Sequence, residues 1–269
     1  MFNDNMSPKY ALIAIVFLMC TFACASVMST RKIPKIVFTY WQSDDSESTD
    51  FVMECIDSWR TCSPDWTIHV LNDATLHRLT DLRRGEEIVQ HFADRLRLDL
   101  LERYGGVWMD ATIWMNKSLN WIHAYNESVI GFKNPIRPET GVMENWFIAC
   151  QAGSPFIREW KREFARLQVH DNFKRVPDDI LMRVENPTYL LQNVAWAMTY
   201  RNNPKLRKTV KLLDSKESVF ALQWKCNWDP SRFARVFALE RHQHDPFVKI
   251  TQVERRTLVQ RNVPTTKLI

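Results

Sequence analysis

The 269-residue sequence lacks three features that would each point to a class of protein. Its six cysteines show no C-x-x-C spacing, so they form no zinc-type ligand set. It has no dense block of basic residues, which argues against a nucleic acid polymer as a partner. No internal repeat is present. The net charge of +5 instead fits an anionic small molecule or a membrane surface.

Glycine is scarce, with 6 residues, whereas tryptophan is plentiful, with 11. Tryptophan fills cores and also stacks on bases and sugars. We expect core packing to account for most of the eleven. Apolar residues make up 45% of the chain and charged residues 25%, which indicates a folded globular protein.

The one long apolar run lies near the N-terminus. Residues 10–30 carry no charge, and about 20 such residues span a bilayer as a helix. We therefore predict a tail at 1–9, a transmembrane signal anchor at 10–30 and one domain at 31–269. The alternative is a cleaved signal peptide, because Ala23-Cys24-Ala25 has the small-x-small form of a cleavage site.

The orientation of this single-pass anchor stays open. Lys9 precedes the run and three basic residues follow it within five positions, which favours a cytoplasmic domain. A Golgi- or ER-type enzyme would need the opposite orientation, and a bacterial protein would lie in the inner membrane. Cys55 and Cys62 leave a related choice open, between a disulfide in an oxidising lumen and buried free thiols.

Strands alternate with helices along the domain, which favours an α/β fold. The patterns predict strands at 35–41, 66–71 and 106–115, and a long helix from Glu86 to Tyr104 that ends at Gly105. The three strands are expected to be neighbours in one mainly parallel sheet, because short connections force that arrangement. Short strands are also expected near 218–222 and 247–252.

Two charged residues lie in an unusual place on the predicted helix. Its apolar residues form two stripes, so the helix is expected to be buried on two sides. Asp94 and Arg97 share the second stripe with Leu98 and Leu101. The plain interpretation is a surface ion pair, but this pattern favours a pair inside the protein.

Asp110 follows a short apolar stretch at the predicted carboxyl edge of the sheet, where open α/β sheets bind ligands. One carboxylate suits Mg²⁺ or Mn²⁺, which complete their shells with water and substrate phosphates. The alternative is that Asp110 only caps a loop. No second acid follows, because Thr112 is the residue two positions later.

The run "ADRLRLDLLERYGGVWMDATIWMNKSL" resembles the signature of DxD-type sugar-binding glycosyltransferases, which include the Och1-like mannosyltransferases. The GGVW-x-DAT form is most similar to the capsular polysaccharide synthesis branch. Upstream "IPKIVFTYWQS" and "CIDSWRTCSPDWTIHVLN", and downstream "NWFIACQAGSPFIREW", extend the resemblance over roughly residues 33–165.

The resemblance implies a GT-A-like, Rossmann-type nucleotide-sugar-binding fold and roles for particular residues. Trp41 would stack on the nucleobase, although a core position is equally open. Asp94 and Arg97 would contact the ribose and diphosphate, and Asp110 would bridge sugar, ribose and a Mn²⁺ or Mg²⁺ ion. Thr112 replaces the second metal-binding Asp of the wider family, as the capsular branch does, and its hydroxyl would face the metal or a phosphate.

The resemblance implies further roles near two other segments. Asn145 would orient the donor sugar or the acceptor. The segment "HDPFVKITQ" resembles one that closes over the diphosphate, which would bring in His242, His244 or Lys249. For the two histidines the plain alternative is an ordinary surface loop.

We therefore predict a membrane-anchored glycosyltransferase. It would move a hexose from a nucleoside-diphosphate sugar to a hydroxyl of a glycan, glycolipid or glycoprotein acceptor, with retention of configuration. No side chain is an evident nucleophile, which favours front-side attack. The rival hypothesis is an inactive sugar- or nucleotide-binding relative, supported by Thr112 in place of the acid. An unrelated membrane-tethered α/β domain is disfavoured by the ordered motifs.

Overall fold

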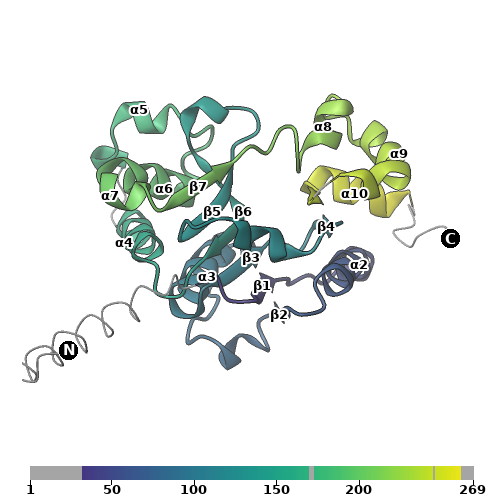
Figure 1. Ribbon diagram of the computed structural model, residues 1–269, viewed down its shortest axis with the longest axis horizontal. Coiled ribbons are helices and arrows are strands. Elements are labelled where there is room, and N and C mark those ends of the chain that lie inside the picture. The colour runs from purple at the N-terminus through teal and green to yellow at the C-terminus, as the bar shows by residue number, and fades with distance from the viewer. Residues whose placement is uncertain (1–31, 170–172, 245, 262–269) are drawn as a thin grey trace, which may run out of the picture. The chain divides into compact units, whose positions relative to one another are not determined.

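A six-stranded sheet lies at the centre of the structure, a computed structural model that describes residues 32–169, 173–244 and 246–261 (Figure 1). The strand order is β2-β1-β3-β6-β5-β7, and β4 and β8 form a separate pair. The strands are β1 (Ile36–Tyr40), β2 (Thr67–Leu71), β3 (Gly106–Met109), β4 (Ile113–Met115), β5 (Val129–Lys133), β6 (Met143–Cys150), β7 (Val210–Leu213) and β8 (Phe247–Lys249).

The central sheet is mainly parallel. Strand β1 pairs in parallel with both β2 and β3, and β5 pairs in parallel with β7. Only β6 runs the other way, because it is antiparallel to both of its neighbours, β3 and β5. The predicted α/β fold is confirmed, and so is the adjacency of the first three predicted strands.

Nine α-helices are described in the same residues, along with five short 3-10 turns. They are α2 (Ser46–Cys62), α3 (Val89–Tyr104), α4 (Pro155–Val169), α5 (Asp178–Leu181), α6 (Leu191–Asn202), α7 (Pro204–Arg207), α8 (Ala221–Lys225), α9 (Pro230–Glu240) and α10 (Gln252–Gln260). The 3-10 turns are η1 (Leu76–Arg78), η2 (Leu119–Ala124), η3 (Pro138–Thr140), η4 (Phe173–Arg175) and η5 (Arg241–Gln243).

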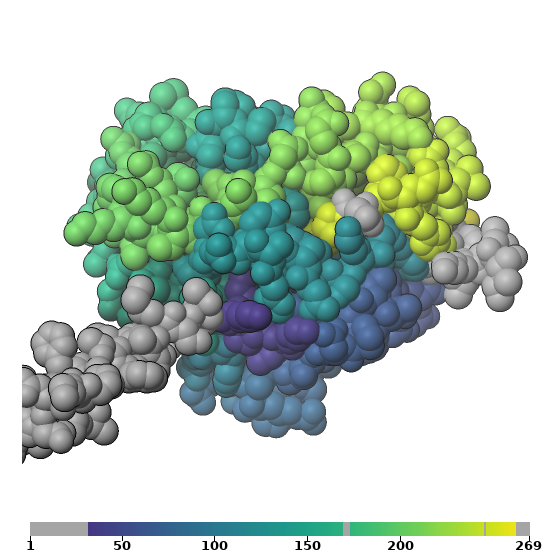
Figure 2. All heavy atoms as spheres, viewed as in Figure 1, coloured from purple at the N-terminus to yellow at the C-terminus, as the bar shows by residue number. Residues whose placement is uncertain are grey.

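Helices cover both faces of the sheet, because successive side chains of a strand point to opposite faces. On β1, Phe38 and Tyr40 join a core with α3, α4 and α6, whereas Val37 joins a core with α2. A third core lies between the outer side of α2, β4 and the C-terminal helices α8–α10. Figure 2 shows the C-terminal segment, in yellow, beside the blue segment that contains α2.

Tryptophan fills these cores as expected, since seven of the eleven are buried: Trp59, Trp66, Trp108, Trp114, Trp146, Trp160 and Trp196.

The double glycine joins α3 to β3 in a space that no side chain could enter. Gly105 ends α3 with a φ of 64°, and its N–H donates to the Leu101 carbonyl oxygen. Gly106 has a φ of 90°, and a Cβ there would lie 2.5 Å from the Ile36 carbonyl oxygen. The pair therefore lets α3 end close to β1 and fixes where β3 begins. The start of β3 in turn fixes the position of Asp110.

Three predicted elements differ from the structure. The strand expected at 106–115 is interrupted, because the chain turns at 111–112 and leaves the main sheet so that β4 can pair with β8. The long helix begins at Val89 rather than Glu86, so Glu86 and Glu87 precede it. Residues 218–222 form a turn and the start of α8 instead of a strand, and their apolar side chains enter two different cores.

The predicted tail at 1–9 and anchor at 10–30 lie outside the described residues. Within the ranges that are described, no helix is both long and apolar enough to cross a membrane. Of the alternatives for Cys55 and Cys62, the structure has no disulfide between them: Cys55 is a buried free thiol of α2, and the half-buried Cys62 thiol of the same helix donates to the Met115 carbonyl oxygen at 3.5 Å.

Candidate active site

Asp110 lies directly after the carboxyl end of β3, at the edge of the sheet where it was predicted. Its backbone N–H donates to the Trp146 carbonyl oxygen at 2.9 Å, which extends the β3–β6 ladder by one residue. Its side chain is one-third exposed (33%) and faces a pocket of about 220 Å³. The indole nitrogen of Trp108 donates to Asp110 Oδ1 at 3.2 Å, so the carboxylate is held in place.

The pocket is lined by the ends of β1 and β3, one side of α3, and the segment before α6. Its lining residues are Tyr40, Trp41, Val89, Gln90, His91, Ala93, Asp94, Arg97, Trp108, Asp110, Ala111, Thr112, Asn145, Tyr189 and Leu190. Six site residues predicted from the sequence are among them, namely Trp41, Asp94, Arg97, Asp110, Thr112 and Asn145. Two other pockets among the described residues have volumes of about 350 and 320 Å³.

Asp94 and Arg97 are buried side chains of α3 that face this pocket. Arg97 Nη1 lies 3.0 Å from Asp94 Oδ1, and Arg97 Nη2 lies 3.6 Å from Asp110 Oδ1. The Arg97 guanidinium also stacks over the Trp108 ring, 5.0 Å from its centroid. One cation thus joins two carboxylates from different elements, an arrangement that differs from an exposed i,i+3 pair on a helix surface.

Burial raises the pKa of Asp94 to about 7, and the negative charges of Asp110 and Glu87 act in the same direction. Arg97 opposes this rise. The carboxyl therefore titrates near neutral pH, which is uncommon outside functional sites.

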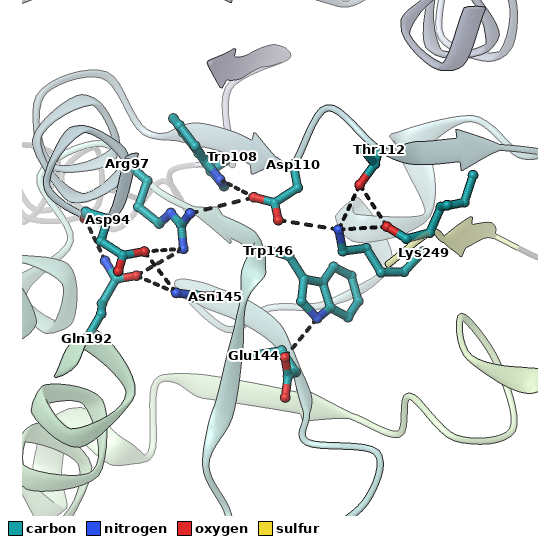
Figure 3. A network of polar contacts seen from close by, with 11 residues as sticks. Asp94, Arg97, Trp108, Asp110, Thr112, Glu144, Asn145, Trp146, Gln192 and Lys249 are labelled. Atoms are coloured by element: carbon teal, nitrogen blue, oxygen red, sulfur yellow. Dashed lines mark hydrogen bonds and ion pairs between the residues drawn. The ribbon is translucent and has the colours of Figure 1, made fainter. Parts of the chain in front are cut away.

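Gln192, on α6, connects this ion pair to β6 and was not singled out by the sequence. Its Oε1 accepts from Arg97 Nη1 at 3.0 Å and from Asn145 Nδ2 at 2.9 Å, and its Nε2 donates to the Asp94 carbonyl oxygen at 2.7 Å (Figure 3). Asn145 Nδ2 also donates to Asp94 Oδ1 at 3.0 Å. The sequence offers little signal for it, because Gln192 is the second residue of a helix that also contains Asn193, Thr199 and Arg201.

Lys249, on β8, approaches Asp110 from the other side. Its Nζ lies 3.4 Å from Asp110 Oδ2 and 2.9 Å from Thr112 Oγ1. Figure 3 shows the ammonium between these two side chains. We call Asp110, Thr112 and Lys249 the edge cluster. Lys249 lies next to the lining residues without being one of them, and its side chain is 11% exposed.

Trp41 lies at the end of β1 with its indole half-buried on the pocket wall. The Arg255 guanidinium of α10 stacks on it at 4.8 Å, and its Nε1 donates to Thr49 Oγ1 at 3.3 Å. The Trp41 side chain is therefore only partly in the core, and Arg255 and Thr49 hold it in place. Tyr189 and His91 line the same pocket, with their ring centroids 5.7 Å apart.

His242 and His244 do not line the pocket. The His242 ring packs edge-on against Trp114, and the His244 carbonyl oxygen accepts from Asn116 Nδ2 at 2.7 Å. Of the three C-terminal candidates, only Lys249 reaches the site.

The predicted metal site at Asp110 and Thr112 does not fit this geometry. Both Asp110 oxygens already face cationic groups, and the Thr112 hydroxyl donates to the Ile250 carbonyl oxygen at 2.8 Å while it faces Lys249. Among the residues that are described, no group of three or more His, Cys, Asp or Glu could hold a metal ion. Mg²⁺ and Mn²⁺ favour carboxylate oxygens, and the edge cluster has one carboxylate beside an ammonium.

The sequence matches one protein family over most of its length. Residues 25–228 match the model of the capsular polysaccharide synthesis protein family. The chain belongs to this family. The match covers the predicted site residues from Trp41 to Asn145, and it ends before His242, His244 and Lys249.

Two curated relatives are glycosyltransferases by name. The chain is 30% identical over 158 residues to O-glycosyltransferase braB of Annulohypoxylon truncatum, which covers 49% of this chain and 37% of the relative. It is 31% identical over 155 residues to glycosyltransferase afumC of Aspergillus fumigatus, covering 49% and 40%. The matched segments thus span about two fifths of these relatives.

Solved structures give weaker similarities. PaToxG glycosyltransferase aligns over 96% of both chains with 15% identity and a TM-score of 0.41. A glycosyltransferase involved in glycosylation of the major capsid of PBCV-1 aligns over 84% of this chain and 97% of its own, with 8% identity and a TM-score of 0.47.

Proposed function

We propose that this protein is a glycosyltransferase with a GT-A-like fold, which moves a hexose from a nucleoside-diphosphate sugar to a hydroxyl of a glycan, glycolipid or glycoprotein acceptor. One observation carries the proposal: Asp110 lies at the carboxyl edge of the parallel strands, between the cations of Arg97 and Lys249, in a pocket with aromatic walls. Ligands of open α/β sheets bind at this edge. Membership of the capsular polysaccharide synthesis family and the names of the relatives support the same activity.

The pocket has a suitable group for each part of such a donor. Trp41 and Tyr189 provide aromatic surface for a nucleobase. Arg97 provides a guanidinium, which suits phosphate oxygens because it donates in a planar fork. Asp110, with a partly exposed carboxylate, can accept hydrogen bonds from ribose or sugar hydroxyls.

We propose retention of configuration by front-side attack. The bond from C1 of the sugar to the diphosphate breaks, the acceptor oxygen bonds to C1 on the same face, and the acceptor proton passes to a diphosphate oxygen. Neither lining carboxylate is favoured as a nucleophile, because Asp94 is buried and paired with Arg97 and Asn145, and Asp110 is held by Trp108 and two cations. Glu144 lies near the site but bonds to Asn134 and Trp146 and does not line the pocket.

A second function is favoured by a specific observation. The edge cluster is already satisfied without a ligand, since Asp110 and Thr112 both face Lys249. A site of this kind suits a nucleotide- or sugar-binding protein without turnover. The two functions differ in whether bound donor is consumed.

The test is consumption of nucleotide sugars by the full chain. Uridine and guanosine diphosphate hexoses are incubated with the protein, and free nucleoside diphosphate is measured. Wild type should consume at least one donor, and Asp110→Ala should be slower by about 10²–10³-fold, comparable to the loss of one stabilising group at the transition state. Asp81→Ala, which removes an exposed carboxylate, is the matched control and should equal wild type.

Binding of a donor without any consumption would favour the binding protein. Activity that is the same in Asp110→Ala as in wild type would contradict the proposed site.

A further inference from the structure

Lys249 lies where a divalent cation was expected. Its three N–H donors face three oxygens, Thr112 Oγ1 at 2.9 Å, Ile250 O at 3.3 Å and Asp110 Oδ2 at 3.4 Å. Two of these oxygens belong to the pair of residues from which a metal site was predicted. A protein cation therefore occupies the same corner of the pocket.

The backbone holds Lys249 in this place. In the β4–β8 pair, Lys249 is opposite Ile113, and the Ile250 N–H donates to the Thr112 carbonyl oxygen at 3.0 Å. The Lys249 N–H donates to the Val219 carbonyl oxygen at 3.2 Å, and its own carbonyl oxygen accepts from buried Gln223 at 2.6 Å. These bonds tie the lysine to the turn that carries Asp110 and Thr112, so the contact is built into the fold.

The same ammonium disfavours a metal ion. An ion bound to Thr112 Oγ1 at a typical Mg²⁺ distance of about 2.1 Å would lie within about 5 Å of Lys249 Nζ, because that nitrogen is itself 2.9 Å from the oxygen. Two cations so close repel each other strongly in a partly buried site. The single charge of Lys249 already balances the single carboxylate of the edge cluster.

We propose that Lys249 takes the place of a divalent ion in this protein and binds the donor diphosphate directly, so that donor binding needs no metal. The inference rests on the proposed function for the identity of the donor. The contacts to Ile250 and Asp110 are the two longer ones, so a phosphate oxygen can replace or share them while the short bond to Thr112 stays. Arg97, across Asp110, would supply the second positive charge.

The first test measures metal binding without any nucleotide. Electron paramagnetic resonance of free Mn²⁺ is followed as full-length protein is added. Wild type should leave Mn²⁺ free at millimolar concentration, and Thr112→Asp/Lys249→Met should bind it, because the double variant has two carboxylates and no ammonium. The inference is overturned if wild type binds Mn²⁺ and Asp110→Asn abolishes that binding. It is overturned as well if the double variant binds none, since Lys249 would then not be what excludes the metal.

The second test measures binding of inorganic pyrophosphate in EDTA by calorimetry. Wild type should bind it, and Lys249→Met should bind it about 10- to 100-fold more weakly, the usual effect of a lost hydrogen bond to a charged group. Lys249→Arg keeps the charge and should bind pyrophosphate more tightly than Lys249→Met. Lys211→Met, which removes a lysine of β7 outside the pocket, is the matched control.

Thermal unfolding of each variant shows that the fold is retained, and methionine preserves most of the apolar stem of lysine. Equal binding by wild type and Lys249→Met, or no binding by wild type in EDTA, overturns the inference. If pyrophosphate binds as expected but no nucleotide sugar is consumed, the proposed function fails and the inference about Lys249 stands.

Discussion

Asp94 and Arg97 form a 3.0 Å ion pair on a buried side of α3, yet burial raises the pKa of Asp94 from 3.8 to about 7. Between these two values the folded protein binds more protons than the unfolded chain, so its free energy of unfolding falls as the pH rises. The decrease due to this one group amounts to about 4 kcal/mol at most. Because Asp94 and Arg97 line the pocket, this loss of stability arises at the candidate active site.

The first prediction is that Asp94→Asn removes this pH dependence. The amide oxygen can still accept from Arg97 and Asn145, but it carries no charge to bury. Urea unfolding at pH 5 and pH 8 should therefore show a smaller loss of stability at pH 8 for the variant than for wild type. An equal loss in both proteins would mean that Asp94 does not titrate in this range.

The second prediction concerns Gln192, which forms hydrogen bonds with Arg97, Asn145 and Asp94. Gln192→Leu should fold less stably by about 2–5 kcal/mol, because it leaves Arg97 Nη1, Asn145 Nδ2 and the Asp94 carbonyl oxygen without this partner inside the protein. Urea unfolding measures the difference. Gln243→Leu, on the exposed turn η5, is the control and should change stability by less than about 0.5 kcal/mol.

The third prediction tests the aromatic wall of the pocket. Trp41→Ala should weaken binding of a nucleoside diphosphate by about 5- to 100-fold, the range for loss of one base-stacking ring, and should leave pyrophosphate binding within about threefold. Calorimetry with both ligands separates the two effects. Trp224→Ala, which truncates a half-buried indole outside the pocket, is the control. Equal loss for both ligands would show that Trp41 supports the diphosphate region or the fold, and not the base.

Local sequence patterns were sufficient for part of this site. Asp110 was placed at the sheet edge from one apolar strand and the glycines before it, and Asp94 and Arg97 were placed inside from the two apolar stripes of one helix. Those features depend on residues that are close in sequence. The assignment to the glycosyltransferases came from the ordered motifs, and the predicted membrane anchor at 10–30 stays a prediction.

Two site residues that local patterns did not place, Gln192 and Lys249, come from segments that are distant in sequence. Gln192 meets Arg97 across 95 positions, and Lys249 meets Thr112 across 137. Lys249 was considered only through the resemblance, and nothing in "FVKI" indicates that β8 pairs with β4. The metal prediction counted the oxygens near Asp110 without the cation that a later strand brings to them.

The last prediction returns to the position where the second acid is missing. Thr112→Asp alone would place a new carboxylate about where Oγ1 now lies, 2.9 Å from the Lys249 ammonium. An ion pair should form there, since opposite charges at that distance in a partly buried site attract strongly. Lys249 would then be held by two carboxylates and less available to phosphate. Pyrophosphate binding in EDTA should weaken by about tenfold or more, the scale of one charged hydrogen bond, whereas Thr112→Ser, which keeps the hydroxyl, should match wild type. Tighter pyrophosphate binding by Thr112→Asp would show that the ammonium does not meet the anion.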